Sequence, residues 1–167
     1  MFRLVAIGIA VATFVGGSAS AKDKPVRVEG VSAPASLPAP PEGMGQIRFW
    51  RSGTMMGKGM GCGVNIGEER ISALGGGKYF ILNLAPGAYE FNAKSEAKDV
   101  LNLEVEPGEV QYVKCTIRMG IMVGRPNLSP SSEAEFAEKR GELTYVDSDD
   151  IGPKVLADPG VAPASEN

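Results

Sequence analysis

The clearest candidates for chemistry in this sequence are its two cysteines, Cys62 and Cys115, which can form a disulfide. Each lies on the apolar face of a segment in which apolar and polar residues alternate, so both side chains are expected to face a core. In an oxidising compartment such a pair forms a structural disulfide, which here closes a loop of about 52 residues. Two buried free thiols are the alternative, because a disulfide requires Cα atoms within about 7 Å of each other.

A glycine-rich loop, residues 55–62, concentrates soft sulfur ligands. Thioethers and thiols without histidine suit Cu(I) rather than zinc or Cu(II). The candidate ligands of such a Cu(I) site are Met55, Met56, Met60 and Cys62, with Met119 and Met122 close to the other cysteine in sequence. The competing interpretation is that methionine fills gaps in a small core. The disulfide and the copper site exclude each other at Cys62, since a cysteine in a disulfide cannot bind a metal as a thiolate.

Two aromatic residues, Trp50 and Tyr112, are candidates for ligand binding. If their rings face solvent, they can stack on a sugar ring or a peptide, which makes a glycan-binding accessory module one hypothesis. The alternative is that each ring packs under a loop. In segment 46–52 the alternation places Ile47, Phe49 and Arg51 on one face and Arg48 and Trp50 on the other.

Catalytic signatures are missing from the sequence. It contains no histidine, and histidine is both the commonest general base and the commonest metal ligand. Neither a Gly-x-Ser-x-Gly elbow nor carboxylates paired at a defined spacing occur, and the glycine-rich stretches 57–59 and 75–78 lack the spacing of a phosphate loop. We therefore expect a protein without enzymatic activity and without a cofactor.

Charge is unevenly distributed along the chain. The formal net charge is −3, and the residues from Asn127 onward hold nine acidic side chains against three basic ones. The part before Asn127 is therefore slightly positive. This excess is small and scattered, which argues against nucleic acid or an anionic membrane surface as a partner.

The amino-terminal residues, 1–21, have the pattern of a cleavable signal peptide. Arg3 precedes an apolar stretch at 4–15, and Ala19 and Ala21 place small residues before a cleavage site at Lys22. About a dozen apolar residues span roughly 18 Å of helix, which is short of a bilayer core of about 30 Å. No cysteine stands directly after the small residues, as a lipoprotein signal would require. We expect a periplasmic or secreted protein that is neither lipid-anchored nor membrane-spanning after cleavage.

The elements that must position these residues are short strands. Alternating runs separated by glycine and proline predict strands over 46–52, 62–66, 70–74, 78–84, 88–95, 100–106, 109–119 and 121–128. Pro107-Gly108 suits a type II turn that pairs 100–106 with 109–119. Because no helix is long enough to cover a sheet, these eight candidate segments predict an all-β antiparallel sandwich of about seven strands.

The flanking segments differ from this domain in composition. Residues 22–43 are rich in proline and alanine and predict an extended linker that acts as a spacer, with a ligand for a proline-binding module as the alternative. Ser131-Ser132-Glu133 predicts the start of a short helix through Lys139. The expected organisation is a signal peptide (1–21), a linker (22–43), a sandwich domain (44–128), a short helix with a strand extension (129–145) and a disordered acidic tail (146–167).

Three short motifs carry a family resemblance: Leu84-Ala85-Pro86-Gly87-Ala88-Tyr89, the Pro107-Gly108 turn and Gln111-Tyr112-Val113. With them, residues 43–143 resemble an uncharacterised bacterial family, a domain of unknown function common among small envelope lipoproteins. The resemblance implies a prealbumin-like or carboxypeptidase-regulatory-like sandwich in the cell envelope, and it implies no catalytic residue. This chain differs from the lipoprotein members in lacking the lipidated cysteine.

These observations favour a non-enzymatic envelope module, periplasmic or secreted, that binds another envelope component or has a structural role. Exposed strand edges are one docking surface for it. Its partner is expected to be an envelope protein or a glycan. The alternatives are the glycan-binding module built on Trp50 and Tyr112 and the Cu(I)-binding protein built on the sulfur residues.

Overall fold

The computed structural model describes residues 36–54, 59–94, 98–118, 120, 124–152 and 154–159. The predicted signal peptide with Ala19, Ala21 and Lys22 lies outside the described residues, as does most of the predicted linker. Met55, Met56, Met119, Met122 and the last part of the tail also lie outside them. What the sequence predicts for these parts stays a prediction.

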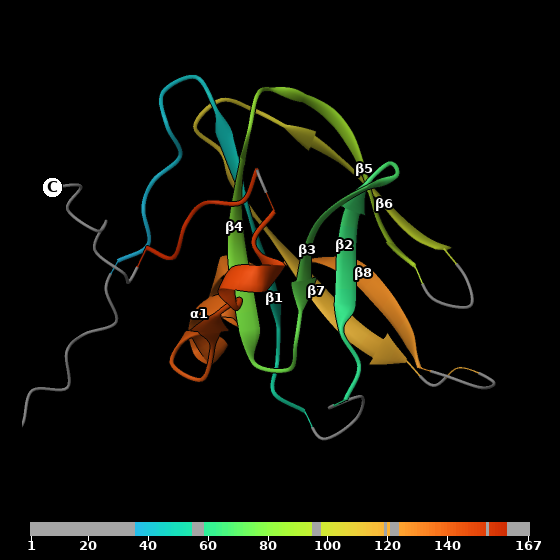
Figure 1. The fold of residues 1–167 in the computed structure, drawn as a ribbon. Coiled ribbons are helices and arrows are strands. Elements are labelled where there is room, and N and C mark those ends of the chain that lie inside the picture. The colour runs from blue at the N-terminus through green and yellow to red at the C-terminus, as the bar shows by residue number, and fades with distance from the viewer. Residues whose placement is uncertain are drawn as a thin grey trace, which may run out of the picture. The chain divides into compact units, whose positions relative to one another are not determined.

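The described chain forms two sheets, which confirms the predicted all-β sandwich (Figure 1). The five-stranded sheet has the order β8-β7-β1-β4-β9, and the four-stranded sheet has the order β3-β2-β5-β6. The strands are β1 (Gly45–Arg51), β2 (Cys62–Ile66), β3 (Glu69–Leu74), β4 (Lys78–Leu84), β5 (Gly87–Lys94), β6 (Lys98–Val105), β7 (Val110–Arg118), β8 (Arg125–Ser131) and β9 (Thr144–Tyr145).

Strand number and strand direction differ from the prediction. The described chain holds nine strands instead of about seven. Two neighbouring pairs, β1 with β7 and β4 with β9, run parallel rather than antiparallel. The reason is that alternation in a sequence identifies the two faces of a strand but not its neighbours in the sheet.

The faces of the two sheets that meet hold the apolar core. Phe49 of β1 stacks on Phe80 of β4 with 4.9 Å between ring centroids, and it contacts Phe91 of β5 in the other sheet at 5.2 Å. All three side chains are buried. Phe49 therefore lies on the side of β1 that faces the other sheet, and this side is called the inner face of the five-stranded sheet.

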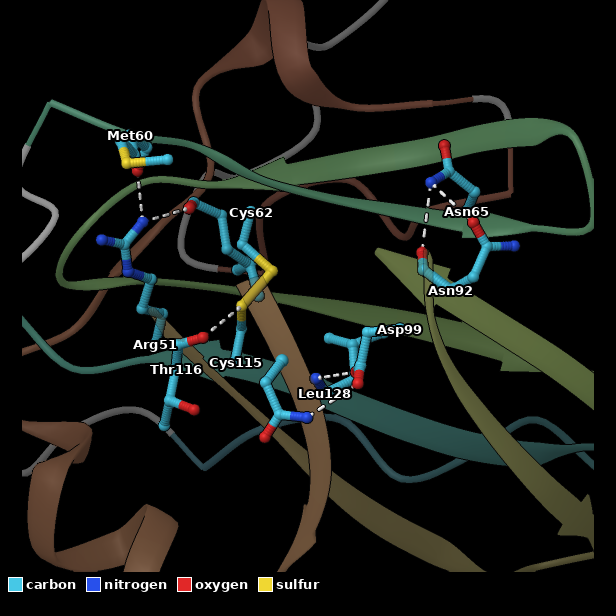
Figure 2. Close-up of a disulfide and its surroundings, with 11 residues drawn as sticks. Arg51, Met60, Cys62, Asn65, Asn92, Asp99, Cys115, Thr116 and Leu128 are labelled. Atoms are coloured by element: carbon cyan, nitrogen blue, oxygen red, sulfur yellow. Dashed lines mark hydrogen bonds between the residues drawn. A yellow bond between two sulfur atoms is a disulfide. The ribbon is translucent and has the colours of Figure 1, made fainter. Parts of the chain in front are cut away.

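A disulfide joins the two sheets. Cys62 begins β2 and Cys115 lies in β7, and their bonded side chains are buried with 6.7 Å between the Cα atoms (Figure 2). The predicted bond is thus confirmed over the alternative of two free thiols. Arg51 lies beside it and donates hydrogen bonds to the backbone carbonyls of Met60 and Leu74. Burial lowers the pKa of the Arg51 guanidinium.

The turn at Pro107-Gly108 does not close a hairpin, so the predicted pairing of its two flanking strands is wrong. β6 pairs with β5, whereas β7 pairs with β1 and β8. The turn instead carries the chain from one sheet to the other. The positive φ expected of Gly108 is present at 77°, and its N–H donates to the carbonyl of Met44 at 2.9 Å.

A helix, α1 (Glu133–Arg140), covers the other face of the five-stranded sheet, called here the outer face. Ser132 caps it as predicted, because its hydroxyl accepts a hydrogen bond from the N–H of Glu135 at 3.1 Å. Phe136 is buried on the inward side of the helix and contacts Trp50, Tyr79 and Tyr112. The helix therefore provides the outer face with an aromatic core of its own.

The tail after Tyr145 is not disordered over its described length, contrary to the prediction. A short 3-10 helix, η1 (Ser148–Asp150), leads to Ile151, which pairs with Ser72 of β3. Val155 then pairs with Leu82 of β4 and is buried. The acidic composition concealed this packing, because the apolar residues of the tail are few and form no periodic pattern.

Candidate functional site

Trp50 and Tyr112 do not form an exposed stacking surface. Trp50 is 2% exposed and Tyr112 is 8% exposed. The indole N–H of Trp50 donates to the hydroxyl of Ser131 at 2.8 Å, and both rings pack against Phe136. The glycan-binding hypothesis needs exposed rings and is therefore wrong in that form. The alternative of packing is correct, with a helix rather than a loop as the cover.

The Cu(I) hypothesis loses its thiolate ligand. Cys62 is bonded to Cys115 and cannot bind a metal as a thiolate. Met60 lies close to Gly124, where an added Cβ would come within 2.8 Å of the methionine sulfur. Met55 and Met56 lie outside the described residues. The site as predicted, with Cys62 among its ligands, is therefore wrong.

The edge of β8 cannot donate to an added strand. Pro126 and Pro130 have no backbone N–H. Between them, the N–H of Leu128 donates to the carboxylate of Asp99 on β6 at 2.7 Å (Figure 2). Because alternate residues of a strand point their N–H groups to the same side, these three positions make up one edge. Proline and a carboxylate thus block this edge, as natural sheets commonly do.

Other strand edges also have partners within the chain. The carbonyl of Ile71 on β3 accepts from the N–H of Gly152, and the carbonyl of Ile81 on β4 accepts from the N–H of Leu156. On β6, the carbonyl of Glu104 accepts from the side chain of Gln111. The idea of docking through exposed strand edges therefore finds no support at these strands.

A hollow on the outer face is a different kind of surface. It lies between α1, the end of the linker and strands β1 and β7, has a volume of about 240 Å³, and is called here the α1 hollow. Arg48, Arg140 and Glu133 contribute charge to its lining, and the apolar part includes Leu37, Tyr112, Phe136 and Ala137. A second hollow, of about 410 Å³, shares the lining residues Tyr112 and Glu133 with it.

Arg48 is held from three sides. Its Nε donates to the side-chain oxygen of Gln46 at 2.8 Å, Nη1 donates to the hydroxyl of Tyr112 at 3.1 Å, and Nη2 donates to the carbonyl of Pro38 at 3.2 Å. Gln46 is in turn fixed by its bond to Asn83 at 3.0 Å. The guanidinium therefore has a defined orientation at the α1 hollow, and the end of the linker takes part in setting it.

Arg140, at the end of α1, is held less completely. Its Nη2 donates to the hydroxyl of Tyr79 at 2.9 Å, its Nη1 donates to the carbonyl of Leu143 at 3.4 Å, and the guanidinium carbon lies 4.5 Å from the centre of the Tyr79 ring. Its Nε is buried and has no hydrogen-bond partner among the described residues. A buried donor without an acceptor is costly, so the hydrogen-bonding capacity of Arg140 is satisfied less fully than that of Arg48.

The two tyrosines of this region stay neutral at physiological pH. Burial raises the pKa of Tyr112, with Arg48 opposing the effect and Glu133 adding to it. Burial also raises the pKa of Tyr79, which Arg140 counteracts. Both hydroxyls can therefore accept from arginine and donate to another group. This combination of guanidinium and phenol groups is suited to binding an acceptor.

Sequence reasoning missed both arginines and Glu133. Arg48 could have been noticed, because it lies on the same strand face as Trp50. The helix residues could not have been placed, since nothing in the sequence says that a segment some ninety residues away covers that face. Tyr112 was identified as a candidate, but as an exposed ring rather than as a partner of Arg48.

In the described residues, no helix has the length and apolar character needed to cross a membrane. The chain matches no curated protein and no solved structure. One family profile, described as "Protein of unknown function (DUF2846)", matches residues 41–126. The match includes Arg48 and Tyr112 and ends before α1. The chain therefore belongs to this family, a family of unknown function.

Proposed function

We propose that this protein is an exported β-sandwich module, without enzymatic activity, that binds another component of the cell envelope at the α1 hollow. The observation that carries the proposal is the pair of arginines at a hollow with aromatic walls, on a molecule in which backbone groups at the edges of β3, β4, β6 and β8 already bond within the chain. Charged groups next to apolar walls are typical of ligand-binding sites.

Export is supported by the disulfide together with the amino-terminal pattern. Buried disulfides persist in oxidising compartments and are rare in the cytosol. Residues 1–21 have the charge, apolar length and small-residue end of a signal peptide. The resemblance to envelope lipoproteins supports the same compartment, and the lack of a cysteine after Ala21 favours a form that is released from the membrane.

A role in binding rather than catalysis is supported by the groups that line the α1 hollow and by Tyr79, which contacts Arg140. The chain contains no histidine. The phenols of Tyr79 and Tyr112 have raised pKa values, which makes them poor bases at neutral pH. Arginine stays protonated and stabilises anions rather than transferring protons.

Export can be tested by expressing the full chain in a bacterium with a periplasm and measuring the intact mass of the product. We expect a chain that begins at Lys22 and is about 2 Da lighter than its reduced form, because a disulfide has lost two hydrogens. A cytoplasmic product that keeps residues 1–21 would contradict the proposal.

Binding can be tested by crosslinking to intact envelopes with two matched variants of α1. Ala137 and Ala134 are both exposed on α1, but only Ala137 lines the hollow. We expect Ala137→Phe, which fills the hollow, to lose the crosslinked partner and Ala134→Phe to keep it. Equal crosslinking by both variants would show that the partner binds elsewhere.

A further inference from the structure

We infer that the ligand of the α1 hollow is a monocarboxylate that carries a compact apolar or aromatic group. This inference rests on the proposed function and names the chemistry of its ligand. It is carried by the unused donors of Arg48 and Arg140 and by the apolar walls beside them.

Arg48 and Arg140 both have N–H groups that are available to a ligand. A guanidinium has five N–H hydrogens arranged in a planar fork. Arg48 uses three of them on protein acceptors, and Arg140 uses two. Both side chains therefore keep hydrogens for a further acceptor. A carboxylate matches two adjacent N–H groups of such a fork and forms charge-assisted bonds with them.

Arg140 has a particular reason to respond to a ligand. Its buried Nε finds no acceptor in the described part of the chain, whereas its Nη groups donate to Tyr79 and Leu143. If the guanidinium turns toward the hollow, a carboxylate can accept from the Nε and one Nη together, which removes the cost of the unpaired donor. Arg48, with all three nitrogens engaged, stays in place as the fixed half of the site.

The charge of the lining favours one negative charge over two. The two guanidiniums are accompanied by the carboxylate of Glu133, which leaves one positive charge to be balanced. Outside this lining, Asp158 adds negative charge near Tyr79, the partner of Arg140. A phosphate dianion or a dicarboxylate would be repelled by these acids, and such repulsion is how sites reject related ligands.

The walls set the size of the rest of the ligand. Leu37, Phe136 and Ala137 contribute apolar surface to the lining. The volume of about 240 Å³ lies below the roughly 300–1,000 Å³ of pockets for drug-sized ligands. The apolar part must therefore be compact, about the size of one aromatic ring. An amino acid at the free end of a peptide and a small aryl acid both meet this description.

The inference can be tested by NMR titration of the full mature chain with phenylacetate and N-acetylphenylalanine, which represent the free acid and the peptide end. We expect saturable shifts of the side-chain Nε–H signals of Arg48 and Arg140. Three control compounds should each bind at least about tenfold more weakly than phenylacetate. Phenylacetamide lacks the negative charge, acetate lacks the ring, and phenyl phosphate carries two negative charges.

Matched variants locate the binding. Arg140→Gln should weaken phenylacetate binding at least about tenfold, and Arg70→Gln, at an exposed arginine outside the α1 hollow, should not change it. Ala137→Phe should abolish binding and Ala134→Phe should preserve it. Neither alanine is buried, so these two variants report on the hollow even if Arg140→Gln disturbs the helix.

Failure of the inference can be separated from failure of the proposed function. If neither acid binds the folded protein, or phenylacetamide binds as well as phenylacetate, the ligand is not a monocarboxylate. If the envelope crosslink is then still lost in Ala137→Phe and kept in Ala134→Phe, the proposed function stands without this ligand.

Discussion

The five-stranded sheet buries both of its faces, but it does so in two different ways. On the inner face, Phe49 and its neighbours pack against the other sheet, and the Cys62–Cys115 disulfide makes the contact covalent. On the outer face, Trp50 and Arg48 are covered by an eight-residue helix and by the end of the linker. One strand, β1, supplies both faces in alternation.

The difference between the faces separates stability from recognition. The inner face consists of close-packed apolar groups, which tolerate little movement without loss of stability. The outer face mixes aromatic rings with arginines whose donors are not all used. A short helix can shift or have a side chain reorient at modest cost, so the outer face is the one suited to a ligand.

The largest expected effect concerns the covalent contact of the inner face. Replacing both Cys62 and Cys115 by alanine should lower the free energy of unfolding by about 4 kcal/mol, because the unfolded chain loses the constraint of the closed loop. Urea unfolding of the variant and of the oxidised wild type measures the difference. A loss below about 1 kcal/mol would mean that packing alone holds the two sheets together.

The next effect concerns the helix that covers the outer face. Phe136→Ala removes the ring that contacts Trp50, Tyr79 and Tyr112 and should cost about 3 kcal/mol. The fluorescence of Trp50, the one tryptophan of the chain, should shift to the red as water reaches it. Ala134→Gly, on the exposed side of α1, serves as control and should cost about 1 kcal/mol through helix propensity alone. If both variants lose the same free energy of unfolding, the Phe136 ring adds nothing to the packing of α1 on the outer face.

The inner face could be predicted from the sequence to a large extent. Alternation placed Cys115 on the apolar face of its strand and separated Phe49 from Trp50 within segment 46–52, and the compartment implied by residues 1–21 made the disulfide the first hypothesis. Turn chemistry placed Gly108 correctly at a positive φ. These signals are local, because side-chain direction along a strand and the conformation of a turn depend on adjacent residues.

The outer face could not be predicted in the same way. Whether Trp50 faces solvent depends on Phe136, and whether the tail is ordered depends on Val155 reaching Leu82. Each of these contacts joins segments that are far apart in sequence. The pairing of the strands on either side of Pro107-Gly108 was predicted wrongly for the same reason. The residues of a turn do not reveal which sheet the next strand joins.

A smaller effect on the free energy of unfolding is expected where polar contacts join β6 of one sheet to β8 of the other. Asp99 on β6 accepts from the N–H of Leu128 at 2.7 Å and from the side chain of Asn127 at 2.8 Å. Asp99→Asn should lower the free energy of unfolding by about 2 kcal/mol, because it removes charge-assisted bonds. Asp149→Asn, at an exposed residue of η1, is the control and should be close to neutral. If the two variants are equally stable, the contact between β6 and β8 does not depend on this carboxylate.

The smallest expected effect is a dependence of the unfolding free energy on pH, which arises at Tyr145. Burial raises the pKa of Tyr145 to about 12, above the ordinary value of about 10. A raised pKa in the folded state means that the neutral phenol is favoured by folding, so this stability is complete below about pH 10 and is lost as the pH rises toward 12. Tyr145→Phe gives up hydrogen bonds to Ile81 and Leu156 and should cost about 1 kcal/mol at pH 7.

Because the variant has no phenol to ionise at position 145, the gap between it and the wild type should narrow between about pH 10 and about pH 12. Urea unfolding at a series of alkaline pH values measures this gap. Tyr89→Phe, which removes a hydroxyl bonded to the carbonyl of Ala85, controls for the loss of a hydrogen bond at a half-buried ring. If the difference in unfolding free energy between Tyr145→Phe and the wild type stays constant across this range, Tyr145 ionises only after β9 has separated from β4. The tail would then open from the outer face before the sandwich itself unfolds.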